Sequence, residues 1–337
     1  MKTVRLAEPG KFEFFESSEP KQNASETIVK VHRIGICGTD IHAFNGRQPF
    51  FTYPRILGHE LGVEVVKLGD NAHGLKIGAK CSLEPYFNCG RCIACNSGKP
   101  NCCTLLNVFG VHSDGGMRSL ISVPTHKLHC SKLLNYDQLA LVETLGIGAH
   151  AVDRARVQSG EFVLVIGAGP IGLSVIQFVQ ASSARVAVMD ISDTRLSFCK
   201  THLGVRDTLK PGDTQLEVLK ALGKGDLPTL VIDATGNPKS MTRAFDFPAH
   251  GGRIVFVGLY QGDISFNDPN FHRRELTLLA SRNALPDTFN LIIKAIEDGK
   301  INTTPWITHR TTLDQISSEF SSLTKDPSAI KIMVDVN

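Results

Sequence analysis

One glycine-rich turn, residues 167–172 (Gly-Ala-Gly-Pro-Ile-Gly), constrains the fold more than any other stretch of the sequence. It follows an apolar run, Glu161–Ile166, that predicts a buried parallel strand, and it opens an apolar helical stretch. Gly167 permits the tight turn, Gly169 lets a pyrophosphate approach the backbone, and Gly172 lets the helix pack on the strand. An isolated G-x-G-x-x-G is a weak signal, but this one has the required strand and helix. It therefore predicts a βαβ unit that binds a dinucleotide at the helix N-terminus.

The rest of the chain shows two patterns. From about residue 160, apolar strand patterns alternate with helical ones, as the βαβ units of a doubly wound parallel sheet require. Residues 1 to about 145 hold short alternating runs punctuated by Gly, Pro and Asn, which predict an antiparallel, partly barrel-like β domain. The fold class is therefore α/β, with a second, mainly β domain. The expected strands are 27–31, 62–66, 161–166, 184–190, 229–233, 253–258, 276–280 and 330–336, and the expected helices include 194–203, 287–298 and 313–323.

An acidic residue, Asp190, closes the strand after the glycine-rich turn, eighteen residues beyond Gly172. A carboxylate in this place accepts hydrogen bonds from the ribose hydroxyls and repels a 2′-phosphate, so NAD is favoured over NADP. Arg195 lies close enough in the sequence to keep NADP open. Asp190 could instead be a helix-capping or solvated acid.

Two short segments, 35–42 and 58–60, concentrate polar groups in an otherwise apolar region. They read Gly-Ile-Cys-Gly-Thr-Asp-Ile-His and Gly-His-Glu, and they supply a thiolate, a hydroxyl, two carboxylates and two imidazoles. Turn signals within residues 44–57 allow the chain to fold back and bring the segments together. Cys, His and carboxylate are zinc ligands, and three of them with one open position form a catalytic site. A lone Cys or His is more often an ordinary core residue, but their density here favours a catalytic metal site.

A second cysteine cluster predicts a different kind of metal site. Cys89, Cys92, Cys95 and Cys103 are spaced by 3, 3 and 8 residues, with turn-forming residues between them. Four thiolates on a compact loop can close a tetrahedral shell around Zn²⁺, which leaves no position for substrate and makes the site structural. An iron–sulfur cluster or adventitious cysteines are the alternatives. The spacing also leaves Cys102 open as the fourth ligand.

The composition excludes several classes of protein. The chain has 337 residues, room for about two domains, and its 36 basic and 33 acidic residues leave a net charge of +3. That charge is too small and too dispersed to indicate nucleic acid or a membrane surface as a partner. No apolar window could span a bilayer and no signal peptide is evident. Nine cysteines point to metal binding in a reducing, cytoplasmic compartment rather than to disulfides, with Cys81, Cys130 and Cys199 as ordinary core or surface residues.

Together these motifs resemble the zinc-dependent medium-chain dehydrogenase/reductases over essentially the full chain. The matching stretches are 35–42, 58–60, the cysteine cluster, 167–172 and 233–236 (Asp-Ala-Thr-Gly). The resemblance implies a GroES-like catalytic domain of residues 1–146 and 282–337, split around a Rossmann NAD-binding domain of 147–281. Within the family, residues 110–116 and 281–284 are most similar to L-galactonate/L-gulonate 5-dehydrogenase-like members, with sorbitol and threonine dehydrogenases close by.

The resemblance also implies roles for the zinc-site residues. Cys37, His59 and Glu143 would ligate the catalytic zinc, with Glu60 behind them or exchanging into the coordination shell. The metal would act as a Lewis acid on a secondary alcohol. Thr39 would pass the alcohol proton through the cofactor ribose to His42, and hydride would go to the nicotinamide. Asp40 would hold the free ring nitrogen of His59. Thr144 stands where many relatives have proline, and we expect it to reshape a loop carrying Glu143.

Cofactor, substrate and assembly follow from the same resemblance. The expected substrate is a small sugar acid or polyol, and the expected assembly is a homodimer or homotetramer. A sorbitol or L-threonine dehydrogenase, a non-catalytic NAD- and zinc-binding regulator, and an NADPH-dependent reductase are the alternatives. Expected substrate contacts are Arg47, His112, Arg282 and Asn283, whose alternative role is as surface residues or in salt bridges. Expected cofactor contacts are Gly167, Gly169, Pro170, Ile171, Gly172, Asp190, Arg195, Thr235, Gly236 and Val257.

Overall fold

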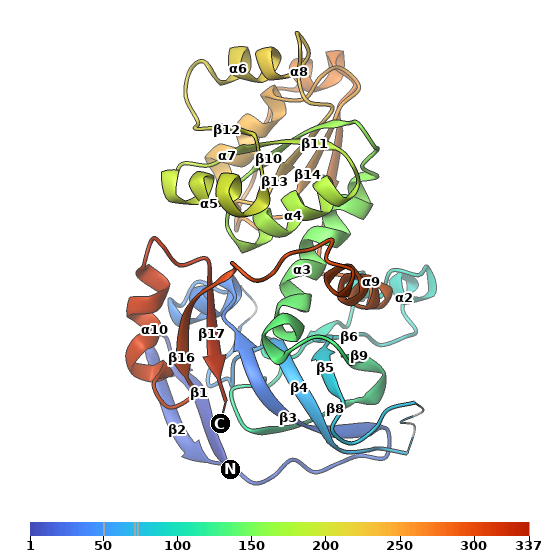
Figure 1. The fold of residues 1–337 in the computed structure, drawn as a ribbon, viewed down its shortest axis with the longest axis vertical. Helices are drawn as coiled ribbons and strands as arrows, with labels where there is room; N and C mark the ends of the chain where they lie inside the picture. The colour runs from blue at the N-terminus through green and yellow to red at the C-terminus, as the bar shows by residue number, and fades with distance from the viewer. Residues whose placement is uncertain (50, 71, 73, 337) are drawn as a thin grey trace. The chain divides into compact units, whose positions relative to one another are not determined.

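The computed structural model describes residues 1–49, 51–70, 72 and 74–336 (Figure 1). Contacts divide the chain into two compact units. The first unit comprises residues 1–144, 284–299 and 303–337, and the second comprises 145–283 and 300–302. Helix α3 (Tyr136–Ala155) carries the chain from the first unit into the second. No helix among the described residues is both long enough and apolar enough to cross a bilayer.

The second unit is built on a six-stranded parallel sheet, which confirms the predicted doubly wound α/β fold. Its strand order, β12-β11-β10-β13-β14-β15, places the strand before the glycine-rich turn, β10, near the middle. Buried aliphatic residues of β10 and β13 form the centre of its core, as fully buried parallel strands require. The strands are β10 (Phe162–Ile166), β11 (Arg185–Met189), β12 (Asp207–Leu209), β13 (Leu230–Asp233), β14 (Arg253–Phe256) and β15 (Thr277–Ala280). The helices are α4 (Pro170–Ala181), α5 (Asp193–Leu203), α6 (Gln215–Leu222), α7 (Pro238–Arg243) and α8 (Asp268–Arg273), with a 3₁₀ turn at Ala244–Asp246.

The first unit holds a seven-stranded sheet that is antiparallel apart from one parallel pair, β16 with β17. Its order is β16-β17-β3-β4-β5-β9, with β8 paired to β3, so the last strand of the chain lies beside the strand that leads into the first polar segment. The sheet strands are β3 (Glu26–Gly35), β4 (Glu60–Lys67), β5 (Lys80–Leu83), β8 (Leu120–Pro124), β9 (Leu128–Ser131), β16 (Ile307–Thr312) and β17 (Lys331–Asp335). Two separate antiparallel pairs accompany it, β1 (Lys2–Glu8) with β2 (Lys11–Glu16) and β6 (Tyr86–Phe87) with β7 (Asn107–Val108). The helices are α1 (Gly38–Phe44), α2 (Ile93–Asn96), α9 (Pro286–Glu297) and α10 (Ile316–Lys325), with 3₁₀ turns at Pro100–Cys102 and Thr125–Lys127.

Two cysteines of this sheet form a disulfide, so the prediction that Cys81 and Cys130 are unpaired was wrong. Cys81 lies on β5 and Cys130 lies directly opposite it on β9. Residues opposite each other on antiparallel strands have neighbouring Cβ atoms, which is the geometry a disulfide needs. The partners are 49 residues apart in sequence, and only the strand register makes them neighbours.

Candidate functional site

Two adjacent strands bring the polar segments together at one point of the first unit. Strand β3 ends at Gly35, which pairs with Glu60 at the start of β4. Cys37 is the N-cap residue of α1, and His59 immediately precedes β4. The ligand atoms of Cys37, His59 and Glu60 all lie within 4.8 Å of one another. A Cβ at residue 35 would lie 2.0 Å from Oε2 of Glu60, so only glycine lets this carboxylate approach the strand.

Glu60 is held by a buried ammonium group that the sequence analysis did not identify. Nζ of Lys331, on β17, lies 2.7 and 2.6 Å from the two carboxylate oxygens of Glu60. It also donates to the carbonyl oxygen of Ile36 and to Oγ1 of Thr144, each at 3.2 Å. Lys331 is 2% exposed and Glu60 is 1% exposed. Burial alone would raise the pKa of Glu60, but the charges of Lys331 and His59 and the hydrogen bonds from Lys331 and Thr144 together lower it, which favours the ionised pair.

Glu143 lies on helix α3 and is bound by a second side chain that the sequence analysis missed. The buried hydroxyl of Tyr86, on β6, donates a hydrogen bond to Oε1 of Glu143. Burial raises the pKa of Glu143 and raises that of Tyr86 well above its usual value, so the tyrosine remains a donor. Glu143 lies outside the compact Cys37–His59–Glu60 group.

The expectation that Thr144 reshapes a loop carrying Glu143 was wrong. Glu143 and Thr144 both lie within helix α3, and the hydroxyl of Thr144 accepts a hydrogen bond from Lys331.

The imidazole of His59 lies between a thiol and a carboxylate. Its Nδ1 is 3.7 Å from Oδ1 of Asp40, which is within ion-pair distance but too long for a hydrogen bond. Both atoms are buried, and neither has a hydrogen-bond partner among the described residues. The other oxygen of Asp40 accepts from the backbone N–H of Cys37 at 2.9 Å. Burial alone would lower the pKa of His59, but the nearby Cys37 and Asp40 raise it well above its usual value. The expected bond from Asp40 to the free ring nitrogen therefore stays a prediction.

The donor set fits a zinc ion. A sulfur, an imidazole and carboxylates are the ligands that zinc prefers. Cys37, Asp40, Glu60 and Glu143 can each carry a negative charge in this largely buried region, and the cationic groups that the structure describes beside them are Lys331 and protonated His59. Unpaired buried charge is costly, so a divalent cation at this point would relieve the excess of anions. The compact group contains Glu60 rather than Glu143, which makes Glu60 a direct candidate for the metal.

The two residues expected to move a proton lie on helix α1. Thr39 is half-buried in its first turn, and His42 is exposed in its last turn. The helix begins at the Cys37 cap, so its start is fixed to the segment that supplies a candidate metal ligand. The relay from Thr39 to His42 stays a prediction.

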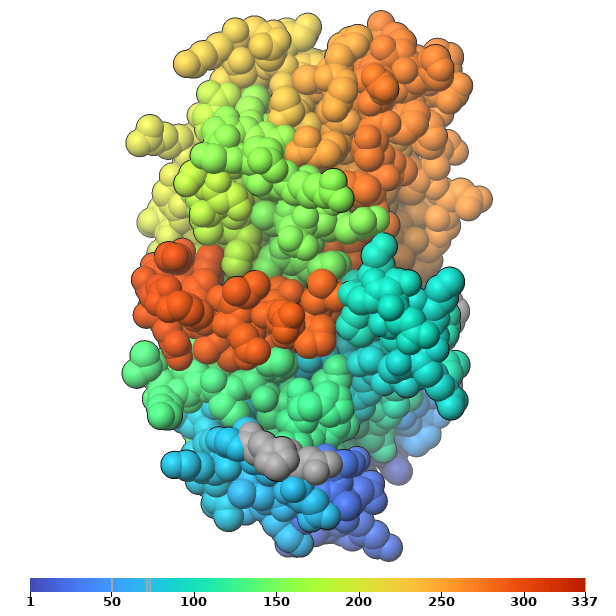
Figure 2. Space-filling model, turned by 90° about the vertical axis from the view of Figure 1, so that its right-hand side faces the viewer, coloured from blue at the N-terminus to red at the C-terminus, as the bar shows by residue number. Residues whose placement is uncertain are grey.

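The cysteine-rich loop gathers four sulfurs of the first unit. Sγ atoms of Cys89, Cys92, Cys95 and Cys103 lie within 4.8 Å of one another, and this group does not contain the exposed Cys102. Backbone N–H groups near Cys95 and Thr104 lower the pKa of Cys92 to about 5, which favours the thiolate that zinc binds. The loop with α2 lies beside helix α9 (Figures 1 and 2). The arrangement fits a closed, structural metal site.

A cluster of charged and polar side chains supports this loop from the 3₁₀ turn before β9, from β9 and from the end of β5. Nζ of Lys127 lies 2.5 Å from Oε1 of Glu84 and 3.2 Å from Oδ1 of Asn88. Nδ2 of Asn88 in turn lies 3.7 Å from Sγ of Cys95. His129 contacts the other oxygen of Glu84 at 3.1 Å. These side chains fix one edge of the loop to the sheet, and none of them was singled out from the sequence.

The glycine-rich turn of the second unit has the geometry that its sequence predicts. Gly167 has a φ of 94°, in the left-handed region, and Gly169 caps helix α4. A Cβ at residue 172 would lie 1.8 Å from the carbonyl oxygen of Gly167, so helix and strand could not pack as they do with a larger residue. Pro170, which has no N–H of its own, and Ile171 lie in the first turn of α4, and the free N–H groups of a helix N-terminus can bind an anion.

Other expected cofactor residues lie at the carboxyl ends of neighbouring parallel strands. Thr235 and Gly236 follow β13, and Val257 follows β14. The carboxylate of Asp190, after β11, accepts from the backbone N–H groups of Ala168 at 2.6 Å and Ser192 at 2.8 Å. The guanidinium of Arg195 approaches Gly169 of the glycine-rich turn. Its Nη1 lies 3.6 Å from the position that a Cβ atom would have at residue 169. Ligands of open α/β sheets collect at this end of the strands.

We predict that Asp190→Ala narrows the preference for NAD over NADP by roughly one to two orders of magnitude. Alanine cannot accept hydrogen bonds from the ribose hydroxyls, and a hydrogen bond to a charged group contributes about 1.5–3 kcal/mol. The measurement is kcat/KM for both cofactors. Asp193→Ala is the matched control, since Asp193 is an exposed acid of the same region paired with Lys210 at 2.9 Å. A wild-type enzyme that turns over NADP faster than NAD would contradict the assignment.

The four expected substrate residues form no single cluster within either unit. Arg47 and His112 are exposed residues of the first unit, and Nδ1 of His112 accepts from the backbone N–H of Val108 at 3.0 Å. Arg282 and Asn283 belong to the second unit. Nδ2 of Asn283 is buried and has no hydrogen-bond partner among the residues that the structure describes.

Comparisons with known proteins agree with this geometry. The alcohol dehydrogenase GroES-like domain matches residues 23–133, and the zinc-binding dehydrogenase family matches residues 170–298. The chain is 41% identical over 311 residues to L-galactonate-5-dehydrogenase of Escherichia coli K12, which covers 92% of this chain and 91% of that protein. It is 30% identical to 2-dehydro-3-deoxy-L-galactonate 5-dehydrogenase of Pseudoalteromonas atlantica, over 97% and 96% of the two chains. A dehydrogenase of Escherichia coli CFT073, RspB, solved with NADH, matches with a TM-score of 0.92 at 29% identity over 99% of both chains.

Proposed function

Because the chain belongs to the zinc-dependent medium-chain dehydrogenase/reductase family, we propose that it oxidises a secondary alcohol of a sugar acid such as L-galactonate or L-gulonate to the ketone, with NAD as hydride acceptor. The enzyme class, a zinc- and NAD-dependent alcohol dehydrogenase, follows from the family. The substrate is the further step. Its main support is the 41% identity to L-galactonate-5-dehydrogenase over nearly the whole of both chains.

The residues of the first unit would bind the metal and control its surroundings. Cys37 and His59 would ligate zinc together with Glu60 or Glu143, and Lys331 and Tyr86 would orient those two carboxylates. Zinc bound there supplies Lewis acidity, which lowers the pKa of the substrate hydroxyl. Thr39 would accept the hydroxyl proton, and His42, being exposed, would release it to solvent.

The residues of the second unit would position the cofactor. The N-terminus of α4 would hold the pyrophosphate, and Asp190 would accept hydrogen bonds from the adenosine ribose. Thr235, Gly236 and Val257 would line the path to the nicotinamide. The redox chemistry belongs to the cofactor, whereas the chain fixes its place and orientation.

A fluorimetric assay of NADH formation tests the proposal. The substrates are L-galactonate, L-gulonate, sorbitol and L-threonine at equal concentration with NAD. We expect the highest kcat/KM with one of the two aldonates. Highest activity with sorbitol or L-threonine would assign the chain to those alternatives. If protein that binds zinc and NAD formed no NADH with any of these substrates, the alternative of a non-catalytic NAD- and zinc-binding regulator would be favoured.

We predict that Arg282→Ala lowers kcat/KM for the sugar acid by about one to two orders of magnitude, because a guanidinium clamp on a carboxylate is a charge-assisted, bidentate contact. Activity towards the matching neutral polyol should change much less. Arg206→Ala, which removes an exposed arginine of the same unit, is the control. If kcat/KM fell equally for the acid and the polyol, Arg282 would have a structural role. The enzyme would then be assigned as a polyol dehydrogenase without preference for sugar acids.

The proposed assembly is a homodimer or homotetramer, and light scattering on the purified protein measures it. A monomer at micromolar concentration would contradict this part of the proposal.

A further inference from the structure

The disulfide of the first unit has one exposed and one buried half, and the dehydrogenase reaction uses neither. Cys130 is exposed on β9, which ends the strand order of the sheet (Figure 1). Cys81, opposite it on β5, is 0% exposed and belongs to the hydrophobic core of the unit. On its other side Cys81 pairs with Val63 of β4, which is also fully buried. A reagent from solvent can therefore reach the pair only through Cys130.

The strand register keeps the two cysteines together whether or not their sulfurs are bonded. The N–H of Glu84 donates to the carbonyl oxygen of Lys127 at 2.8 Å, which marks this opposed pair as a hydrogen-bonded one. Hydrogen-bonded and non-hydrogen-bonded pairs alternate along antiparallel strands. Cys81 and Cys130 lie three residues away in the same register, at a non-hydrogen-bonded pair, where side chains are closest. The backbone pairing thus places the sulfurs side by side without needing the bond.

The same two strands carry the buried polar side chains that support the four-sulfur loop. His129 is the chain neighbour of Cys130, and Glu84 follows Cys81 by three residues. Nε2 of His129 and Oε2 of Glu84 lie 3.1 Å apart. A bond between the cysteines therefore fastens the end strand of the sheet to β5 directly beside this support.

We propose that Cys81 and Cys130 form a reversible exchange site for low-molecular-weight thiols and disulfides. Cys130 is the attacking residue, because it is the accessible one. Cys81 is the resolving residue: the apolar core shields it from reagents, and its place opposite Cys130 makes its own attack intramolecular.

The exchange is balanced in atoms and electrons. In the reduced pair, the Cys130 thiolate attacks one sulfur of a small disulfide, the sulfur–sulfur bond of that reagent breaks, and one small thiolate leaves. The sulfur of Cys81, having lost its proton, then attacks Sγ of Cys130 and expels the second small thiolate. Two protein thiols are oxidised, the small disulfide is reduced to two thiols, and the two protons pass to those thiols through solvent. An excess of small thiol drives the same steps in reverse.

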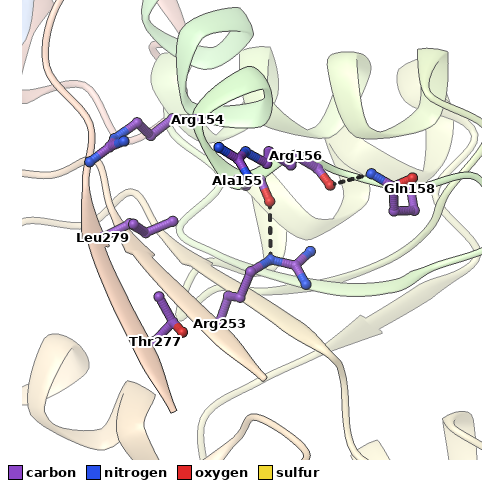
Figure 3. A pocket seen from close by; sticks show the side chains of 7 residues that line it. All are labelled: Arg154, Ala155, Arg156, Gln158, Arg253, Thr277 and Leu279. Atoms are coloured by element: carbon purple, nitrogen blue, oxygen red, sulfur yellow. Dashed lines mark hydrogen bonds between the residues drawn. The ribbon is translucent and has the colours of Figure 1, made fainter. Parts of the chain in front are cut away.

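Other places in the described chain lack this arrangement. Cys102 is exposed, but it belongs neither to the disulfide nor to the four-sulfur group. Cys199 is buried, and burial raises the pKa of its thiol to about 12. The pocket in Figure 3 is lined by arginine, alanine, glutamine, threonine and leucine and offers no sulfur. Cys102 is therefore the matched control, a thiol that can accept an adduct without a resolving sulfur opposite it.

Peptide mapping by mass spectrometry tests the proposal on zinc-loaded protein saturated with NADH. The protein is reduced with excess 2-mercaptoethanol, desalted and treated with hydroxyethyl disulfide, the neutral disulfide of the same thiol. We expect the bond between Cys81 and Cys130 to form, with at least about tenfold less adduct on Cys130 than on Cys102. Renewed excess of 2-mercaptoethanol should reduce the bond in the folded protein.

Two variants separate the roles of the two sulfurs. Cys81→Ala removes the resolving sulfur, so Cys130 should keep the adduct at about the level of Cys102. Cys130→Ser removes the attacking sulfur, so Cys81 should carry no adduct. Both variants should retain zinc and bind NADH, since neither sulfur belongs to a metal group or to the dinucleotide site.

The wild-type measurement decides the proposal even if a variant fails to fold. Four outcomes would overturn it: an adduct that persists on wild-type Cys130, no reaction at either cysteine, a bond that excess thiol leaves intact in the folded protein, or an adduct on Cys81 of the Cys130→Ser variant.

Discussion

Replacing Lys331 with methionine should lower the free energy of unfolding by about 3–5 kcal/mol, the cost of leaving a buried charge without its partner. The carboxylate of Glu60 would lose both contacts from Nζ, at 2.7 and 2.6 Å. The carbonyl of Ile36 and the hydroxyl of Thr144 would lose a donor in the same buried place. Methionine has a similar length, so the change removes charge more than volume. Urea unfolding of the zinc-loaded protein measures the effect.

A double-mutant cycle separates this pair from general damage to the core. Glu60→Gln in the Lys331→Met background should cost much less than Glu60→Gln alone, because the first change has already removed the charge it would leave unpaired. The surface pair Lys294–Asp298, at 2.9 Å, is the matched control, and Lys294→Met should leave the free energy of unfolding nearly unchanged because solvent screens an exposed pair. Additive losses for Glu60 and Lys331 would show that their contact is not what stabilises this region.

Much of the fold could be predicted from the sequence because its signals are local. The apolar run before Gly167 and the glycines after it specify a strand, a turn and a helix within about twenty residues. The alternating runs at 27–31 and 62–66 likewise became the inner parts of β3 and β4. Helix α3 was not predicted, although it spans Tyr136–Ala155. We attribute this to its largely buried sequence, which gives little contrast between an apolar and a polar face.

The supports of the metal centre could not be predicted, because their partners are distant in sequence. Lys331 is 271 residues from Glu60, and Tyr86 is 57 residues from Glu143. One signal was present: a lysine opens the final strand directly before three apolar residues, and a charge in a strand expected to be buried requires a counter-ion. The sequence gives no register for β17 against β3, so it could not name Glu60 as that partner. The Cys81–Cys130 pair was missed for the same reason.

The second large effect concerns two cysteine variants, one in each ligand group. We expect one variant to lose activity and the other to lose stability, and each to lose one zinc ion. The two ligand groups predict two zinc ions per chain. Cys37→Ala should retain about one zinc and lower kcat/KM by about three orders of magnitude or more, because a bound metal supplies several kcal/mol and each 1.36 kcal/mol is tenfold. Its unfolding transition should shift little, since His59, Glu60 and Lys331 remain in the same buried cluster.

Cys92→Ala should have the opposite profile, with about one zinc retained at the Cys37 group and a large loss of stability. The four-sulfur loop is short, and its helix α2 spans only Ile93–Asn96, so few apolar contacts hold it without the metal. Closure of a four-thiolate shell contributes folding free energy directly. Metal analysis, urea unfolding and NADH formation on both variants make the comparison. A Cys92→Ala protein as stable as wild type but inactive would reverse the two assignments, because the loop would then serve the chemistry rather than the fold.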